Sequence, residues 1–94
     1  MTYRLVFKAA AKKEWDKLDS TIRQQFKKKL IECIKNPKVE SFRLNGMQDC
    51  YKIKLRSAGY RLVYQVRDEE LVVAVVAVGK RERNHVYNAA VKRI

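Results

Sequence analysis

Eight consecutive apolar residues, 71–78, constrain the fold of this chain more than any other feature of its sequence. A strand that is apolar at every position is typical of the centre of a sheet whose two faces are both covered. The run is too short to cross a membrane, which takes about 20 apolar residues, and no longer run occurs elsewhere. Residues 71–78 are therefore predicted to form a central strand, which Gly79 ends.

Apolar residues alternate with other residues in the two segments before this strand. They are Tyr51, Ile53 and Leu55 in the first segment and Tyr60, Leu62, Tyr64 and Val66 in the second. A period of two predicts strands with one buried face, and residues 57–59 are typical of a tight turn between them. Pairing Arg56 with Arg61 keeps both apolar sets on one side of the hairpin. Lys52 and Lys54 then emerge on the other side together with these two arginines.

The remaining segments have helical periodicity, apart from a short first strand at residues 3–7. Residues 8–18 and a segment that begins at Thr21 and stops at Asn36-Pro37 carry apolar side chains at helical spacing. They should form a helical hairpin, followed by a connection without clear period at residues 38–49. Asn84 is a suitable N-cap for a last helix. The apolar stripe of that helix is predicted to consist of Tyr87, Ala90, Val91 and Ile94.

These segments follow the order β-α-α-β-β-β-α. The expected fold class is α+β, with a mostly antiparallel four-stranded sheet, a helical hairpin and a C-terminal helix. A length of 94 residues leaves room for one domain, and residues 1–94 are expected to form it.

Lysines and arginines outnumber acidic residues by 22 to 10, which gives a net charge of +12. A small domain needs a net charge of only about 2–8 to stay in solution, and a larger excess attracts polyanions. Residues 50–67 contain five cations and no acid, so nothing within this segment neutralises the basic face of the hairpin. Nucleic acid is the expected partner, with an ordinary solvated polar face as the alternative.

Further cations follow the central strand, in the sequence Lys80-Arg81-Glu82-Arg83. They lie beside the start of the last helix, and helix N-termini attract anions in their own right. Tyr87, one turn into that helix, is either a phenol directed toward the same region or a core aromatic. The second helix carries three more candidate RNA contacts, although such a run is more often a solvated face. These are Lys27, Lys28 and Lys29.

Cys33 and Cys50 do not have the spacing of a zinc site, and two cysteines with one histidine indicate neither a structural metal nor a disulfide framework. No metal or cofactor is expected. The N-terminus has no long apolar segment behind a basic cluster, so we expect a protein that is neither exported nor membrane-spanning, and hence cytoplasmic.

Three stretches of the sequence resemble the RelE family. They are CYKIKLRS at residues 50–57, GYRLVYQV at 59–66 and VGKRER at 78–83, with Val86-Tyr87 after them, and the similarity extends over essentially the whole chain. This family belongs to the RelE/ParE toxin superfamily and comprises toxins that cleave mRNA in the ribosomal A site. The resemblance implies a microbial-ribonuclease-like fold and metal-independent attack of a ribose 2′-OH on the adjacent phosphodiester, which inhibits translation.

The resemblance also implies functional residues. The catalytic positions of the family fall on Lys52, Lys54, Arg61, Arg81 and Tyr87. The expected RNA or ribosome contacts are Arg56, Lys80, Arg83, Lys27 and Lys28. Arginine is permanently charged and makes bidentate phosphate contacts, so the two catalytic arginines suit charge stabilisation. The two lysines suit electrostatic clamping better than proton abstraction, and the general base stays open.

His85 is the sole imidazole of the sequence. About 200° around the helix axis separate it from Tyr87, so the two are not expected to face one pocket, and His85 is predicted to face solvent.

The family implies two partners, the ribosome with its mRNA and a RelB-type antitoxin that displaces or covers the last helix. Two alternatives stay open at this point. One is a ParE-like toxin that inhibits DNA gyrase by binding it, and the other is a non-enzymatic RNA-binding module.

Overall fold

The computed structural model of the chain describes residues 2–82 and 85–94. In chain order its elements are β1 (Arg4–Phe7), α1 (Ala9–Asp16), α2 (Ser20–Cys33), η1 (Glu40–Phe42), β2 (Cys50–Leu55), β3 (Tyr60–Arg67), η2 (Asp68–Glu70), β4 (Val72–Lys80) and α3 (His85–Arg93). The predicted order β-α-α-β-β-β-α is confirmed, and the two short 3₁₀ helices η1 and η2 lie in its connections.

The strands form one sheet in the order β1-β4-β3-β2. β1 runs parallel to β4, and the other two pairings are antiparallel, so the sheet is mostly antiparallel as predicted. β4 lies inside the sheet, and its residues from Val72 to Val78 are buried. This agrees with an apolar strand covered on both faces.

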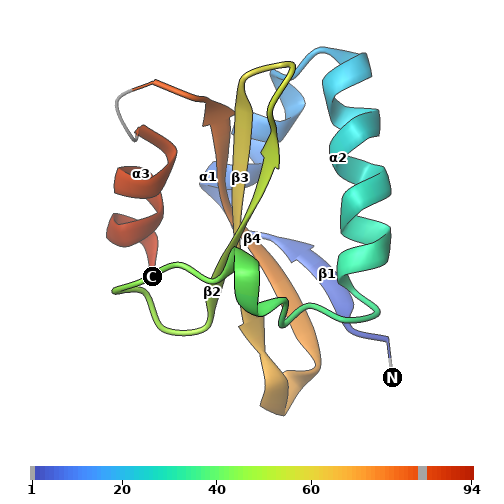
Figure 1. Ribbon diagram of the computed structural model, residues 1–94, viewed down its shortest axis with the longest axis vertical. Coiled ribbons are helices and arrows are strands. Elements are labelled where there is room, and N and C mark those ends of the chain that lie inside the picture. Colours follow the sequence, from blue (N-terminus) through green and yellow to red (C-terminus); the bar gives the residue numbers. More distant parts are fainter. Residues whose placement is uncertain (1, 83–84) are drawn as a thin grey trace.

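Helices cover both faces of the sheet (Figure 1). α1 and α2 pack on one face, where Ala11, Phe26 and Leu30 meet the alternating apolar residues of β2 and β3. α3 packs on the other face, where Val86 and Ala90 meet Val63, Val76 and Ala77. The cationic residues of β2 and β3 point to this second face, beside α3.

The register of the hairpin differs from the prediction by two residues. Arg61 pairs with Lys54, not with Arg56, which lies in the turn after β2. A shift of two leaves every side chain on its predicted face, so the alternation of apolar residues is satisfied by both pairings. The turn decides between them: Gly59 has a φ of +71° and its N–H donates to the Leu55 carbonyl at 2.8 Å, which closes a four-residue loop.

The ends of β4 also differ from the prediction. Leu71 has a φ of +54° and precedes the strand, which continues through Gly79 to Lys80. Gly79 pairs with Arg61 of β3, so the glycine is part of the ladder and does not end it. The pairing continues because Tyr60 still has Lys80 as its partner.

The buried face of α3 is rotated from the predicted stripe. Val86 and Ala90 are buried and Tyr87 is half-buried, whereas Val91 and Ile94 are exposed. Val86 takes the inner position because Gly79 has no side chain there; a Cβ at Gly79 would lie 3.4 Å from the Val86 side chain. The predicted cap Asn84 lies outside the described residues.

Candidate functional site

A small hollow lies where β3, the end of β4 and the start of α3 meet. Its volume is about 220 Å³, and it is lined by Arg61, Lys80, Arg81, Glu82, His85, Val86 and Tyr87. Lys80 and Arg81 are exposed, whereas Arg61 and Tyr87 are half-buried. The hollow therefore has exposed cations at its rim and half-buried polar groups inside, an arrangement suited to an anion.

Backbone contacts hold Arg81 at this place. Its N–H donates to the carbonyl of Gly59 in the β2–β3 turn at 2.7 Å, next to the Tyr60–Lys80 pair. The end of β4 and the hairpin turn are thereby joined. Arg81, which follows β4, is brought to the same end of the sheet as Arg61, which lies near the start of β3.

Arg61 contacts Tyr87 directly. Arg61 Nη1 donates a hydrogen bond to the Tyr87 hydroxyl oxygen at 3.2 Å, and the guanidinium carbon is 5.3 Å from the centre of the ring. The hydroxyl accepts this bond, so its own hydrogen is free to be donated to another group. Arg61 retains further N–H donors for an anion.

Lys52 and Lys54 lie beside Arg61 on the same sheet face. Lys54 is directly opposite Arg61, and Lys52 is two residues farther along β2. The pKa of Lys54 is lowered, first by the positive charge of Lys52, then by partial loss of solvent, and then by Arg61. This shift reflects a concentration of positive charge that no acidic group within residues 50–67 offsets.

A separate groove lies between α2 and β2, and it is lined by Lys52, Lys54, Arg56 and Lys28 among others. The two catalytic lysine candidates therefore border this groove and not the hollow, although Lys54 has Arg61 as its cross-strand neighbour. Lys27 is exposed on α2, outside the lining of both depressions. Arg83 lies outside the described residues.

His85 and Tyr87 both line the hollow, and the expectation that they would not share a pocket is wrong. The hollow surrounds the first turn of α3, so residues on different sides of that turn can border it. His85 is exposed, as predicted. Glu82 was missed by the sequence reasoning; it is the single acid after residue 70, and it brings a carboxylate to the rim of an otherwise cationic site.

The site brings together groups that suit the chemistry of a phosphodiester. Arg61 and Arg81 are suited to stabilising negative charge, and Tyr87 can donate a hydrogen bond. Among residues 2–82 and 85–94 there is no group of three or more His, Cys, Asp or Glu side chains that could hold a metal ion. No helix in the same part of the chain is long and apolar enough to span a bilayer.

Comparison with known proteins agrees with this picture. Residues 5–85 match the family of ParE toxins of the type II toxin-antitoxin system parDE. The mRNA interferase toxin RelE of Escherichia coli K12 and the mRNA interferase RelE of Shigella flexneri are each 63% identical to the chain over 94 residues, which is all of this chain and 99% of each relative.

Solved structures give the same result. A mutant of the E. coli toxin RelE in the free state matches with a TM-score of 0.93 at 61% identity, covering 100% of this chain and 99% of that one. RelE in the intact E. coli RelBE toxin-antitoxin complex matches with a TM-score of 0.83 at 62% identity, covering 86% and 99%. The chain therefore belongs to the ParE toxin family of type II toxin-antitoxin systems, and its full-length identity places it with the RelE proteins of that family.

Proposed function

We propose that this chain is the toxin of a toxin-antitoxin pair and acts as an mRNA interferase, an endoribonuclease that cleaves mRNA in the ribosomal A site and so inhibits translation. The names of the relatives at 63% identity support this reading. The observation that carries it within the molecule is the convergence of Arg61, Arg81 and Tyr87 on one hollow, with Lys54 beside Arg61.

The proposed reaction is attack of a ribose 2′-oxygen on the neighbouring phosphorus. The 2′-oxygen loses its proton and bonds to phosphorus, while the bond to the 5′-oxygen of the next nucleotide breaks and that oxygen gains a proton. The products carry a 2′,3′-cyclic phosphate and a 5′-OH. Negative charge rises on the phosphorane, and Arg61 and Arg81 are assigned to stabilise it. Neither needs to change its own charge to do so.

Tyr87 and the two lysines are assigned to the remaining tasks. The free hydroxyl hydrogen of Tyr87 is available for a hydrogen bond to the substrate. Lys52 and Lys54 hold the message electrostatically. The lowered pKa of Lys54 favours its neutral, proton-accepting form, but a bound phosphate raises this pKa again. Lysine and tyrosine side chains are in general poor proton acceptors near neutral pH. We therefore expect efficient cleavage only when the ribosome orients the message in the site.

Several further assignments belong to the same proposal. Residues 1–94 form a single toxin domain, located in the cytoplasm with the ribosomes. Arg56, Lys80, Arg83, Lys27 and Lys28 are assigned as RNA or ribosome contacts. A RelB-type antitoxin is the cognate protein partner, as in the RelBE complex of the E. coli relative. The net charge of +12 favours both ribosomal RNA and an acidic antitoxin.

The matching family model is named after ParE, but the RelE relatives at 63% identity favour RNA cleavage over gyrase inhibition. The deciding experiment incubates the purified chain with programmed ribosomes in the presence of a chelator and maps new 5′-OH ends on the message. We expect cleavage in the A site. Intact message together with inhibition of DNA supercoiling by gyrase would favour the ParE alternative. Salt-sensitive RNA binding without new ends would favour the binding module.

A matched pair of arginine variants tests the assignment of Arg81. Arg81→Ala is expected to lower the cleavage rate by about 10²–10³ while ribosome affinity changes much less, because the additional negative charge that it stabilises develops only in the transition state. Arg67→Ala is the control, since Arg67 is also exposed but lies at the other end of β3. Equal losses of rate and affinity in Arg81→Ala would refute the assignment.

A further inference from the structure

The edge of β4 next to β1 is open over its second half. β1 pairs with β4 from Arg4–Val72 to Phe7–Val75, and the Lys8 N–H donates to the Val75 carbonyl at 3.0 Å. Beyond this point β1 has ended. The register between β3 and β4 also shifts, since Val63 pairs with Ala77 and Tyr64 with Val75, which leaves Val76 as an extra residue. The backbone near Val76 therefore needs partners other than strands.

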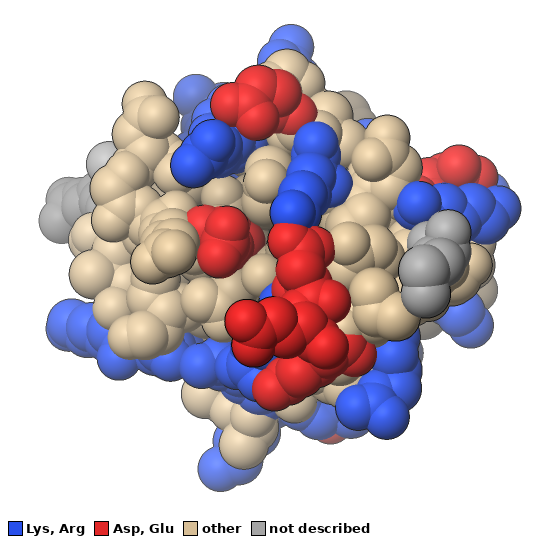
Figure 2. Space-filling view, turned by 90° about the horizontal axis from the view of Figure 1, so that it is seen from below, with Lys and Arg blue, Asp and Glu red and all other residues tan. Residues whose placement is uncertain are grey.

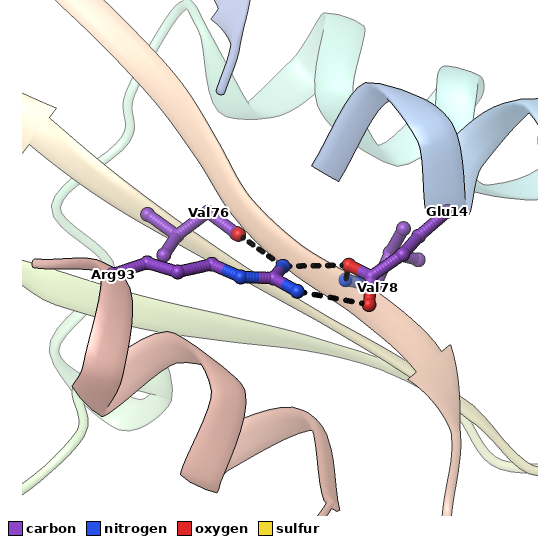
Figure 3. A network of polar contacts seen from close by, with 4 residues as sticks. All are labelled: Glu14, Val76, Val78 and Arg93. Atoms are coloured by element: carbon purple, nitrogen blue, oxygen red, sulfur yellow. Dashed lines mark hydrogen bonds and ion pairs between the residues drawn. The ribbon is translucent and has the colours of Figure 1, made fainter. Parts of the chain in front are cut away.

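Two charged side chains supply these partners (Figure 3). Arg93 of α3 donates from Nη1 to the Val76 carbonyl at 2.9 Å, and Glu14 of α1 accepts from the Val78 N–H at 3.3 Å. The two side chains also bind each other, with Nη1 to Oε1 at 2.7 Å and Nη2 to Oε2 at 3.3 Å. This is a bidentate pair that closes around the open edge of the strand.

The network joins the C-terminal end of α3 to α1 and to the sheet. The Lys8 ammonium adds a hydrogen bond to the carbonyl of Arg93 at 2.6 Å. The side chains of Glu14 and Arg93 are only 27% and 25% exposed, so water replaces little of what is lost when one partner is removed. The other described ion pairs are more exposed at both partners.

α3 is the element that carries Tyr87, and its outer residue Val91 is exposed, as is Ile94 just after the helix. Its buried side chains against the sheet are two small ones, Val86 and Ala90, with Tyr87 and Ala89 partly buried beside them. Such an apolar contact allows a helix to slide or rotate more readily than a directional bidentate bond does. The hydroxyl of Tyr87 nevertheless lies within hydrogen-bond distance of Arg61.

We propose that Glu14 and Arg93 are positioning residues for Tyr87: their ion pair, anchored on Val76 and Val78, fixes α3 so that the phenol stays against Arg61. Neither residue touches the hollow. This inference rests on the proposed function, because it assigns a purpose in catalysis to the position of Tyr87.

The kinetic test compares Glu14→Ala and Arg93→Ala with Asp16→Ala, which removes an exposed ion pair to Lys12 on the same helix α1. On programmed ribosomes at saturating protein, each of the first two is expected to lower the single-turnover cleavage rate about tenfold, with ribosome affinity within about twofold of the parent. Asp16→Ala should cleave at the parental rate. Arg93→Lys, which keeps the charge without the bidentate geometry, should lie in between.

A double-mutant cycle shows whether the effect passes through Tyr87. In a Tyr87→Phe background, Glu14→Ala is expected to lower the remaining rate by less than about twofold, because the group that it positions is already gone. A tenfold loss in both backgrounds would overturn the proposal, as it would show that the ion pair acts independently of Tyr87.

Hydrogen exchange tests the same pair without ribosomes. The amides of α3 in Arg93→Ala are expected to exchange about tenfold faster than in the parent. The amides of β3 in this variant, and the amides of α3 in the Asp16→Ala control, should exchange at the parental rate. Unchanged exchange in α3 would overturn the proposal even if the parent cleaves message. Faster exchange in a chain that cleaves nothing would instead place the failure in the proposed function.

Discussion

At the scale of single residues, Arg61 has a different neighbour on each side. Lys54 is its partner on β2, Gly79 is its partner on β4, and Tyr87 accepts its hydrogen bond. Lys54 repels the guanidinium, while the absent side chain of Gly79 leaves room on the side of α3. These neighbours explain why Arg61 extends toward Tyr87 instead of lying over β2.

Arg61→Lys separates the charge of this residue from its geometry. A lysine keeps the charge but cannot contact a phosphate through two donors and hold the phenol at the same time. We expect the cleavage rate to fall by about 10²-fold, with ribosome affinity nearly unchanged. Arg67→Lys on the same strand is the control. A parental rate in Arg61→Lys would mean that charge alone suffices at this position.

Lys54→Gln is expected to raise stability and lower activity. The lowered pKa of Lys54 means that its charge is unfavourable in the folded chain, mainly because of Lys52. We expect a higher Tm at pH 7 and a cleavage rate reduced about tenfold or more. Lys13→Gln, at an exposed position of α1, should give no such increase in Tm.

The salt and pH dependence of the gain in Tm tests whether repulsion between Lys54 and its neighbouring cations causes that gain. The gain in Tm should shrink as salt is added, since screening weakens the repulsion between Lys52 and Lys54. The folded chain loses the Lys54 proton at a lower pH than the unfolded chain, so the penalty is fully present below the lowered pKa and disappears as the pH rises toward the ordinary lysine value. A gain in Tm that is independent of salt would contradict this explanation.

At the scale of elements, the packing of α3 on β4 sets the shape of the site. Gly79 is a point of close approach, because a Cβ there would lie 3.4 Å from the Val86 side chain. The N-terminal turn of α3 therefore lies close enough to β4 for Tyr87 to reach Arg61. A residue larger than alanine at Gly79 has to move the helix or the strand.

Gly79→Val should displace α3, whereas Gly79→Ala should nearly fit. We expect the valine variant to lose about 1–3 kcal/mol of unfolding free energy through overpacking and to cleave message at least about tenfold more slowly. The alanine variant should lose less than about 1 kcal/mol. Denaturant unfolding and single-turnover cleavage measure the two effects, and equal behaviour of the two variants would show that α3 tolerates a wider gap.

The elements themselves could be predicted because period and composition determine them locally. The run 71–78 and the alternation around Ile53 and Leu62 identify the strands without any knowledge of distant contacts. The register could not be predicted in this way, because pairing Arg61 with Lys54 or with Arg56 gives the same faces. Glu14 and Arg93 lie 79 residues apart in two different helices, and no periodicity indicates that they meet at an open strand edge.

The whole molecule is electrically asymmetric along its sheet. β3 and β4 are antiparallel, so the η2 turn with Asp68, Glu69 and Glu70 lies at the end opposite to the β2–β3 turn and Arg81 (Figure 1). Seen from that lower end, acidic side chains gather in a patch that Lys and Arg side chains surround (Figure 2). The carboxylate of Asp68 binds the Lys38 ammonium and the Tyr3 hydroxyl, and both lower its pKa. The cations of the hollow therefore lie at the end of the sheet away from this acidic patch, and we expect a polyanion to bind there.

This polarity predicts a position-dependent effect of salt on ribosome binding. Lys80→Gln removes one exposed cation at the rim of the hollow, so affinity should fall and the slope of log affinity against log salt should become shallower by about one. Lys35→Gln is the control, since Lys35 is also exposed. It follows Ile34, whose carbonyl accepts from the Tyr3 N–H beside the start of β1, so it lies at the acidic end. Its slope should match that of the parent, because a residue at that end contacts no phosphate. Titration of ribosomes at several salt concentrations measures both slopes, and equal slopes for the two variants would mean that the chain binds through its overall charge without a preferred end.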